Sequence, residues 1–262
     1  MTSTFVMAGV ATAVFLFIVI LLDERYGLLS SDRFPSENAR YAAYAWLGLI
    51  TFFITTSVIG SASSGGALDL EKVRFVSIFS MHAVLITFLL GWWLLSGRKP
   101  IRQFLNLHGD ELPQSLAIGI AAGVGGWLVT ITVALIFGMI AQETGMMPEN
   151  LEPAPMILFL SNLAVWQKLL IVGSAMTVEE FFFRGWLQKR FGLAVSTAIF
   201  ALAHAGYGQP MLLIGVTVIS LVIGTTFYYT RRLLPCIIAH GVFDAIQIFM
   251  IVPFALKATG AG

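Results

Sequence analysis

The stretch Met176-Thr-Val-Glu-Glu-Phe-Phe-Phe-Arg-Gly185 decides how the rest of this chain is interpreted. It places Glu179, Glu180 and Arg184 inside a run that is otherwise as apolar as a transmembrane helix. On insertion scales, each ionisable group held near the centre of a bilayer costs roughly 2.5–3.5 kcal/mol. Three such groups on one hydrophobic helix therefore indicate a buried site, for which other segments of the chain must supply partners.

The composition is that of a membrane protein. Of the 262 residues, 58% are hydrophobic and only 11% are charged, whereas about a quarter of a soluble domain is charged. The fold class we expect is all-α, a polytopic integral membrane protein with a polar site buried in its helix bundle. A net charge of +1 gives no indication of a nucleic-acid partner. The single cysteine, Cys236, excludes an intrachain disulfide and a cysteine-rich metal site.

Hydrophobic segments predict about eight membrane spans, with seven or nine as alternatives. A helix needs about 20 apolar residues to cross the hydrocarbon layer. We expect one membrane domain over residues 1–262, in which residues 1–141 hold four spans without motifs and residues 169–256 form the core that carries the polar residues. Gly119-x-x-x-Gly123 predicts close helix packing. The predicted spans are Phe5–Leu22, Tyr41–Ala62, Phe75–Ser96, Leu112–Ala141, Leu169–Leu187, Phe191–Tyr207, Met211–Thr230 and Leu233–Leu256.

Loop charges and helix geometry predict that the polar residues of the second half meet. Arg and Lys favour the loops after odd-numbered spans, which predicts that these loops are cytoplasmic and that both termini lie outside. At about 1.5 Å of rise per residue, Glu179, His204 and His240 lie roughly 16, 20 and 12 Å from the cytoplasmic ends of their helices. Three helices that cross in different directions thus bring polar groups to one slab, which favours a single shared site.

The charges of the central stretch divide into a pair and a free carboxylate. Glu180 and Arg184 stand at i,i+4 with the acid first, the favourable order for a helical ion pair. Glu179 points about 100° away around the helix, with no such cation on its own helix. We therefore predict that Glu179 is the free carboxylate and the candidate general base. The alternative, a purely structural triad, fits Glu180 and Arg184 better than Glu179.

The histidines and Asp244 complete the candidate site. Asp244 can accept a hydrogen bond from His240 at i,i+4 and fix its tautomer. His204 alone is more typical of a structural histidine, and so is His82 in the third span, although His82 could also line the cavity. One glutamate and one histidine can hold and deprotonate a water while a second histidine stabilises an oxyanion.

The same groups allow a second chemistry, because histidine and carboxylate are also zinc ligands. Glu179, His204 and His240 would form the set, so the cofactor we expect is either none or zinc. The sequence has no His-Glu-x-x-His motif that would support a soluble zinc protease.

Three motifs together resemble those of one family of intramembrane proteases. Glu179-Glu180-x-x-x-Arg184, Phe200-x-x-x-His204 and His240-x-x-x-Asp244 are similar to the motifs of the type II CAAX prenyl endopeptidase and bacteriocin-processing family, and the resemblance covers roughly Leu169–Leu256. It implies hydrolysis of a peptide bond in a membrane-associated protein or peptide. It also implies a multi-pass protein of a bacterial or archaeal cytoplasmic membrane, with lipid and that substrate as its partners.

The resemblance also implies a role for each motif residue. Glu179 and His204 would activate the water, and His240 and Asp244 would stabilise the oxyanion or complete the site. Glu180, Arg184 and Phe200 would support them. The family is described both as metalloproteases and as enzymes with a metal-free glutamate mechanism.

Two other functions stay open on the sequence. A proton-coupled transporter is one, since intramembrane Glu, Asp and His also mark proton paths. The sequence shows no inverted repeat or paired broken helices that would support it. A non-catalytic immunity or regulatory member of the same fold is the other, and the presence of all three motifs argues against it.

Overall fold

The computed structural model describes residues 2–30, 32, 34–63, 74–107, 111–146, 155–205 and 210–259. Over these ranges the chain is helical with no strand, which confirms the all-α class. Its α-helices are α1 Thr2–Tyr26, α2 Glu37–Ser63, α3 Ser80–Leu95, α4 Ile101–Leu105, α5 Leu112–Glu143, α6 Pro155–Ser161, α7 Val165–Ser174, α8 Lys189–Ala203, α9 Pro210–Thr230, α10 Leu233–Ile246 and α11 Val252–Thr259. A 3-10 helix, η1 (Phe75–Phe79), leads into α3, and the π-helical segments are η2 Ala175–Glu179, η3 Phe181–Gln188 and η5 Gln247–Ile251.

Six helices in the described ranges are long and apolar enough to cross a membrane, as an integral membrane protein requires. They coincide with six of the eight predicted spans and run over Ser3–Tyr26, Glu37–Gly60, Phe75–Leu95, Leu112–Glu143, Met211–Thr230 and Leu233–Lys257. The fifth predicted span is also continuous helix, through α7, η2 and η3. It is not among the six because Glu179, Glu180 and Arg184 lie inside its apolar stretch and make that stretch more charged than theirs.

The sixth predicted span coincides with a short, bent helix. The helix α8 has 15 residues and bends at Gly192, whose φ of 82° and ψ of 175° are not helical. Positive φ is open to glycine at little cost, so the chain turns there, at the start of the sixth predicted span. The predicted end of this span at Tyr207 lies outside the described residues, as does His108.

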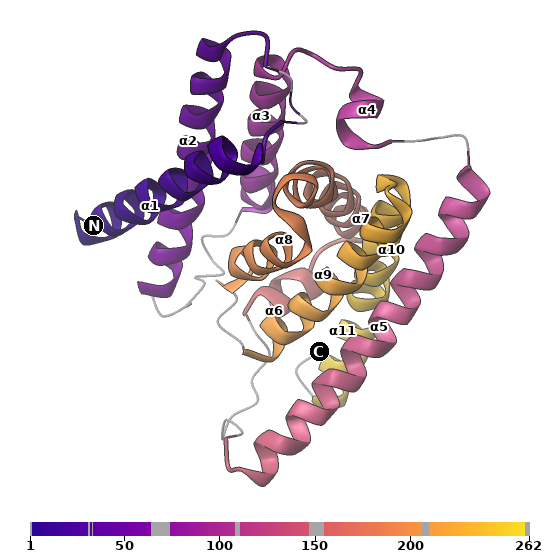
Figure 1. Ribbon diagram of the computed structural model, residues 1–262. Helices are drawn as coiled ribbons and strands as arrows, with labels where there is room; N and C mark the ends of the chain where they lie inside the picture. The colour runs from indigo at the N-terminus through magenta and orange to yellow at the C-terminus, as the bar shows by residue number, and fades with distance from the viewer. Residues whose placement is uncertain are drawn as a thin grey trace.

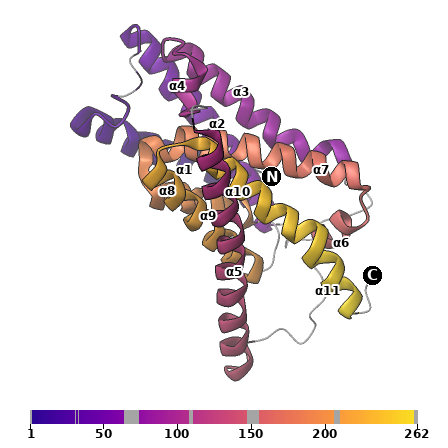
Figure 2. The ribbon, with the colours of Figure 1, turned by 90° about the vertical axis from the view of Figure 1, so that its right-hand side faces the viewer.

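The motif-bearing helices lie in the middle of the bundle. In Figure 1, α7, α8, α9 and α10 are flanked by α2 and α3 on one side and by the long α5 on the other. The turned view of Figure 2 shows α3 and α7 running side by side, and η2 packs against both α3 and α10. An aromatic core joins α3 to η3. The centroid of the Trp186 ring lies 4.7 Å from that of Phe88 and 4.9 Å from that of Trp92, and both contacts are edge-on. The first half of the chain therefore forms one wall of the space around the motifs.

Glycines on α5 let it approach α10 closely. A Cβ added at Gly119 would lie 2.6 Å from the Cβ of Ile238, and one added at Gly123 would lie 2.7 Å from the carbonyl oxygen of Ala239. Small residues allow helix backbones to come close in membranes, where packing drives association. The predicted packing role of this motif is confirmed, and its partner is the helix that carries His240.

We expect Gly123→Ala to destabilise the fold and Gly125→Ala to leave it intact. A methyl group at residue 123 would press on the α10 backbone, and such overpacking costs about 1–3 kcal/mol. The Cβ at residue 125 would meet no described atom within 4 Å, and alanine there favours the helix by about 0.5–1 kcal/mol. Thermal unfolding in detergent checks both. Equal midpoints for the two variants would contradict the close approach of α5 and α10.

Candidate active site

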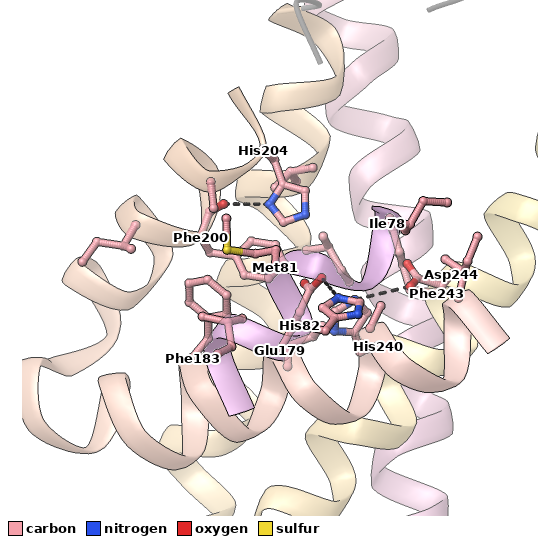
Figure 3. Close-up of a pocket in the computed structure, with 18 of the residues that line it drawn as sticks. Ile78, Met81, His82, Glu179, Phe183, Phe200, His204, His240, Phe243 and Asp244 are labelled. Atoms are coloured by element: carbon pink, nitrogen blue, oxygen red, sulfur yellow. Dashed lines mark hydrogen bonds and ion pairs between the residues drawn. The ribbon is translucent and has the colours of Figure 1, made fainter. Parts of the chain in front are cut away.

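One cavity of about 440 Å³ gathers the polar side chains that the sequence singled out. Its lining includes Glu179, His204, His240 and Asp244, so these four residues face one cavity, and His82 faces it with them. The remaining wall is apolar, with Met81 and Phe183 among its residues. Figure 3 shows the polar groups arriving from several different helices.

The two adjacent glutamates diverge at the junction of two π-helical segments. Glu179 is the last residue of η2, and η3 begins directly after Glu180. A π turn bonds i to i+5 instead of i+4, and such turns occur frequently at functional sites. Glu179 lines the cavity and contacts α3, whereas Glu180 is fully buried against α10. One short stretch therefore serves two separate polar clusters.

Glu180 is the centre of a buried network behind the cavity. Arg184 Nη1 donates to Glu180 Oε1 at 3.0 Å, which confirms the predicted ion pair. Arg184 Nη2 also donates to the carbonyl and hydroxyl oxygens of Ser220 on α9, at 3.1 and 3.0 Å. The guanidinium carbon lies 4.9 Å from the centre of the Phe200 ring, a cation–π contact. This network explains how both charges are tolerated with 0% exposure.

Glu179 has a partner that the sequence did not predict. Its Oε1 lies 3.3 Å from Nε2 of His82, which belongs to α3. The prediction that Glu179 is a free carboxylate is therefore wrong. It rested on the absence of a cation on the same helix, whereas His82 comes from a different helix. Oε2 of Glu179 is buried and has no hydrogen-bond partner among the described residues. Oε1 is thus bound by His82, and Oε2 is the oxygen left without a protein partner in the described part of the chain.

His240 lies between two carboxylates. Its Nδ1 is 2.8 Å from Glu180 Oε1, and its Nε2 is 3.4 Å from Asp244 Oδ2. The predicted contact with Asp244 is present, but the shorter contact is with Glu180. Since the same Glu180 oxygen accepts from Arg184, Nδ1 of His240 carries a proton and donates to it. The two flanking carboxylates fix the plane of the His240 ring.

His204 lines the cavity from a different side. Its Nδ1 lies 2.8 Å from the carbonyl oxygen of Phe200, which can only accept, so Nδ1 carries the proton. The ring lies against Phe200, with centroids 4.5 Å apart. In Figure 3, His204 stands apart from the group formed by Glu179, His82 and His240. In a neutral ring Nε2 is then an acceptor, suited to a water hydrogen.

The described residues do not form the predicted zinc set. No group of three or more His, Cys, Asp or Glu side chains in the described ranges is arranged to hold a metal ion. Glu179 turns one oxygen to His82, and His240 turns both nitrogens to carboxylates. These contacts engage Glu179 Oε1 and both nitrogens of His240, so a metal ion held by His240 would have to displace a carboxylate from it.

Comparison with known proteins identifies the motif-bearing segment. Residues 160–246 match the family described as type II CAAX prenyl endopeptidase Rce1-like. Over these residues, about a third of the chain, the protein is similar to the Rce1-like family. The match contains all three motifs and the helices from α7 to α10 that surround the cavity.

A curated protein gives a weaker resemblance. The uncharacterized protein YpbD of Bacillus subtilis (strain 168) is 39% identical over 69 residues, which cover 26% of this chain and 36% of that protein. No solved structure matches. The Rce1-like assignment therefore rests on the second half of the chain, while α1 to α5 lie outside the matched segment.

Sequence reasoning undervalued His82. A single histidine in an otherwise uncharged span is more typical of a structural residue, and the structure bears out the alternative given above, that His82 lines the cavity. A usable signal existed, since His82 is an ionisable residue in a segment, Phe75–Ser96, without Lys, Arg, Asp or Glu. Burying an ionisable group is costly, so His82 is expected to have a polar partner. Only the fold shows that this partner is Glu179.

Proposed function

We propose that this protein is an intramembrane endopeptidase that cleaves a peptide bond in a membrane-associated protein or peptide. The observation that carries the proposal is the carboxylate of Glu179, which has one oxygen held by His82 and the other unbonded within the described residues, in a cavity shared with two further histidines. The Rce1-like match over the same residues supports peptide hydrolysis over proton-coupled transport.

Glu179 would act as the general base. Its Oε2 takes a proton from a water as the water oxygen attacks the scissile carbonyl carbon, and Nε2 of His204 accepts the water's other hydrogen to orient it. His240 and Asp244 face the same cavity. The imidazolium of His240, stabilised by Glu180 and Asp244, offsets the negative charge of the tetrahedral intermediate.

Collapse of the intermediate completes the reaction. The carbonyl re-forms, the C–N bond breaks, and the proton held by Glu179 passes to the leaving nitrogen. The products are a carboxylic acid and an amine, and Glu179 returns to its starting form. Asp244 serves here as the group that orients His240, since an ionised carboxylate cannot donate to an oxyanion.

The proposal is tested by finding the substrate. Membranes from cells that carry the wild type or Glu179→Gln are compared by quantitative proteomics of new peptide termini. We expect at least one membrane-associated cleavage product to be present with the wild type and absent with the variant. Identical sets of termini, with both proteins inserted at equal levels, would contradict a proteolytic function.

A further inference from the structure

A histidine from the N-terminal half of the chain reaches the site. His82 lies on α3, outside the segment that matches the family. The other buried residues of α3 are Leu85, Phe88, Leu89 and Trp92, so His82 is the ionisable member of that face. Its side chain is 11% exposed and lines the same cavity as Glu179. Burying a polar ring is costly unless it is hydrogen-bonded, so its partner indicates what it does.

The contact of His82 is directed at Glu179. Nε2 lies 3.3 Å from Glu179 Oε1, and since a carboxylate can only accept, Nε2 carries the proton and donates. Nδ1 is buried with no hydrogen-bond partner in the described part of the chain. The ring of Phe79 meets the imidazole edge-on at 6.2 Å and limits its rotation. Figure 3 shows the ring beside the Glu179 carboxylate.

A donor on one oxygen fixes the carboxylate. The last torsion of a glutamate side chain is broad and roughly two-fold, whereas a general base must be held within about 0.5 Å of its working position. With Oε1 bound by His82, the carboxylate plane is set and Oε2 is left for the water. We infer that His82 is the positioning residue for Glu179, supplied by α3 from outside the family segment. The inference rests on the proposed function of the site.

Kinetics separate positioning from simple packing. His82→Ala removes the donor, and His82→Gln keeps an amide N–H near the position of Nε2. Thr87→Ala is the matched control, because Thr87 is an exposed residue of α3 whose hydroxyl bonds to its own helix at Ala83. With a membrane-proximal peptide substrate, we expect His82→Ala to lower kcat by about 10- to 100-fold, as for loss of an outer-shell partner, with KM unchanged.

The rescue variant decides the outcome. His82→Gln should recover most of the lost kcat, while Thr87→Ala should match the wild type. A role limited to packing predicts instead that both His82 variants lower the unfolding temperature and leave kcat per folded molecule unchanged. Wild-type kcat in His82→Ala, or equal kcat in His82→Ala and His82→Gln, would overturn the inference.

A chemical readout tests the contact without any cleavage. Dicyclohexylcarbodiimide modifies protonated carboxyl groups in apolar surroundings, and labelling at Glu179 is measured by mass spectrometry, with buried Glu180 as the internal reference and Glu179→Gln as the blank. A hydrogen bond from His82 stabilises the carboxylate, so labelling should rise in His82→Ala and return to the wild-type level in His82→Gln. Unchanged labelling would overturn the positioning role. Failure of cleavage in the wild type would count only against the proposed function.

Discussion

Glu179→Gln is expected to lower kcat for a membrane-proximal peptide by about 10²- to 10⁴-fold, the range that general acid–base catalysis contributes. Glutamine has the same shape, and its Oε1 can still accept from His82, so the fold and the substrate site are kept. It cannot take a proton from water. The loss should therefore appear in kcat and leave KM unchanged, as measured with purified protein in detergent.

A matched control comes from the same type of substitution at the surface. Glu143 is an exposed glutamate at the end of α5, and Glu143→Gln should retain wild-type kcat and KM. If Glu179→Gln cleaves at the wild-type rate, Glu179 is not the base and the mechanism proposed above is wrong.

Arg184→Ala is expected to have the largest effect on stability. Removing one member of a buried ion pair leaves the other charge uncompensated and costs about 3–5 kcal/mol. Here Glu180 would lose a hydrogen bond of 3.0 Å in a place with 0% exposure, and Ser220 would lose its donor. The measurement is the midpoint of thermal unfolding in detergent.

The comparison is with a surface arginine. Arg102 is exposed on α4, and Arg102→Ala should change stability by no more than about 0.5 kcal/mol. Equal unfolding midpoints for Arg184→Ala and Arg102→Ala would mean that the charge of Glu180 is compensated in another way.

The hydrophobic pattern predicted most of the fold because it reports directly on the environment of each segment. Six spans and the close packing of α5 follow from apolar length and glycine spacing, whereas the identity of its partner α10 comes from the structure. The short, bent α8 could not be predicted in the same way. It bends because Gly192 has a positive φ. Any glycine can adopt such a conformation, so the presence of a glycine in the sequence does not show that the helix breaks there.

The site was predictable where its contacts are local. The Glu180–Arg184 and His240–Asp244 contacts are i,i+4 pairs, so helix geometry alone brings them together. The His82–Glu179 and His240–Glu180 contacts join residues 97 and 60 positions apart. Such contacts depend on which helices become neighbours, and charge patterns along single helices do not contain that information.

The wide spread of the site along the chain also sets when it can exist during synthesis. The cavity wall begins on α2, its positioning histidine comes from α3, and His240 and Asp244 lie on α10, close to the end of the chain. Proteins are made from the N-terminus, with earlier segments folding first. A nascent chain with α1 to α9 inserted would carry Glu179 and His204 without His240, the residue proposed to stabilise the oxyanion, and without Asp244, which orients it. Under the proposed function, hydrolytic capacity would therefore arise only once α10 has entered the bilayer and packed beside η2 and η3.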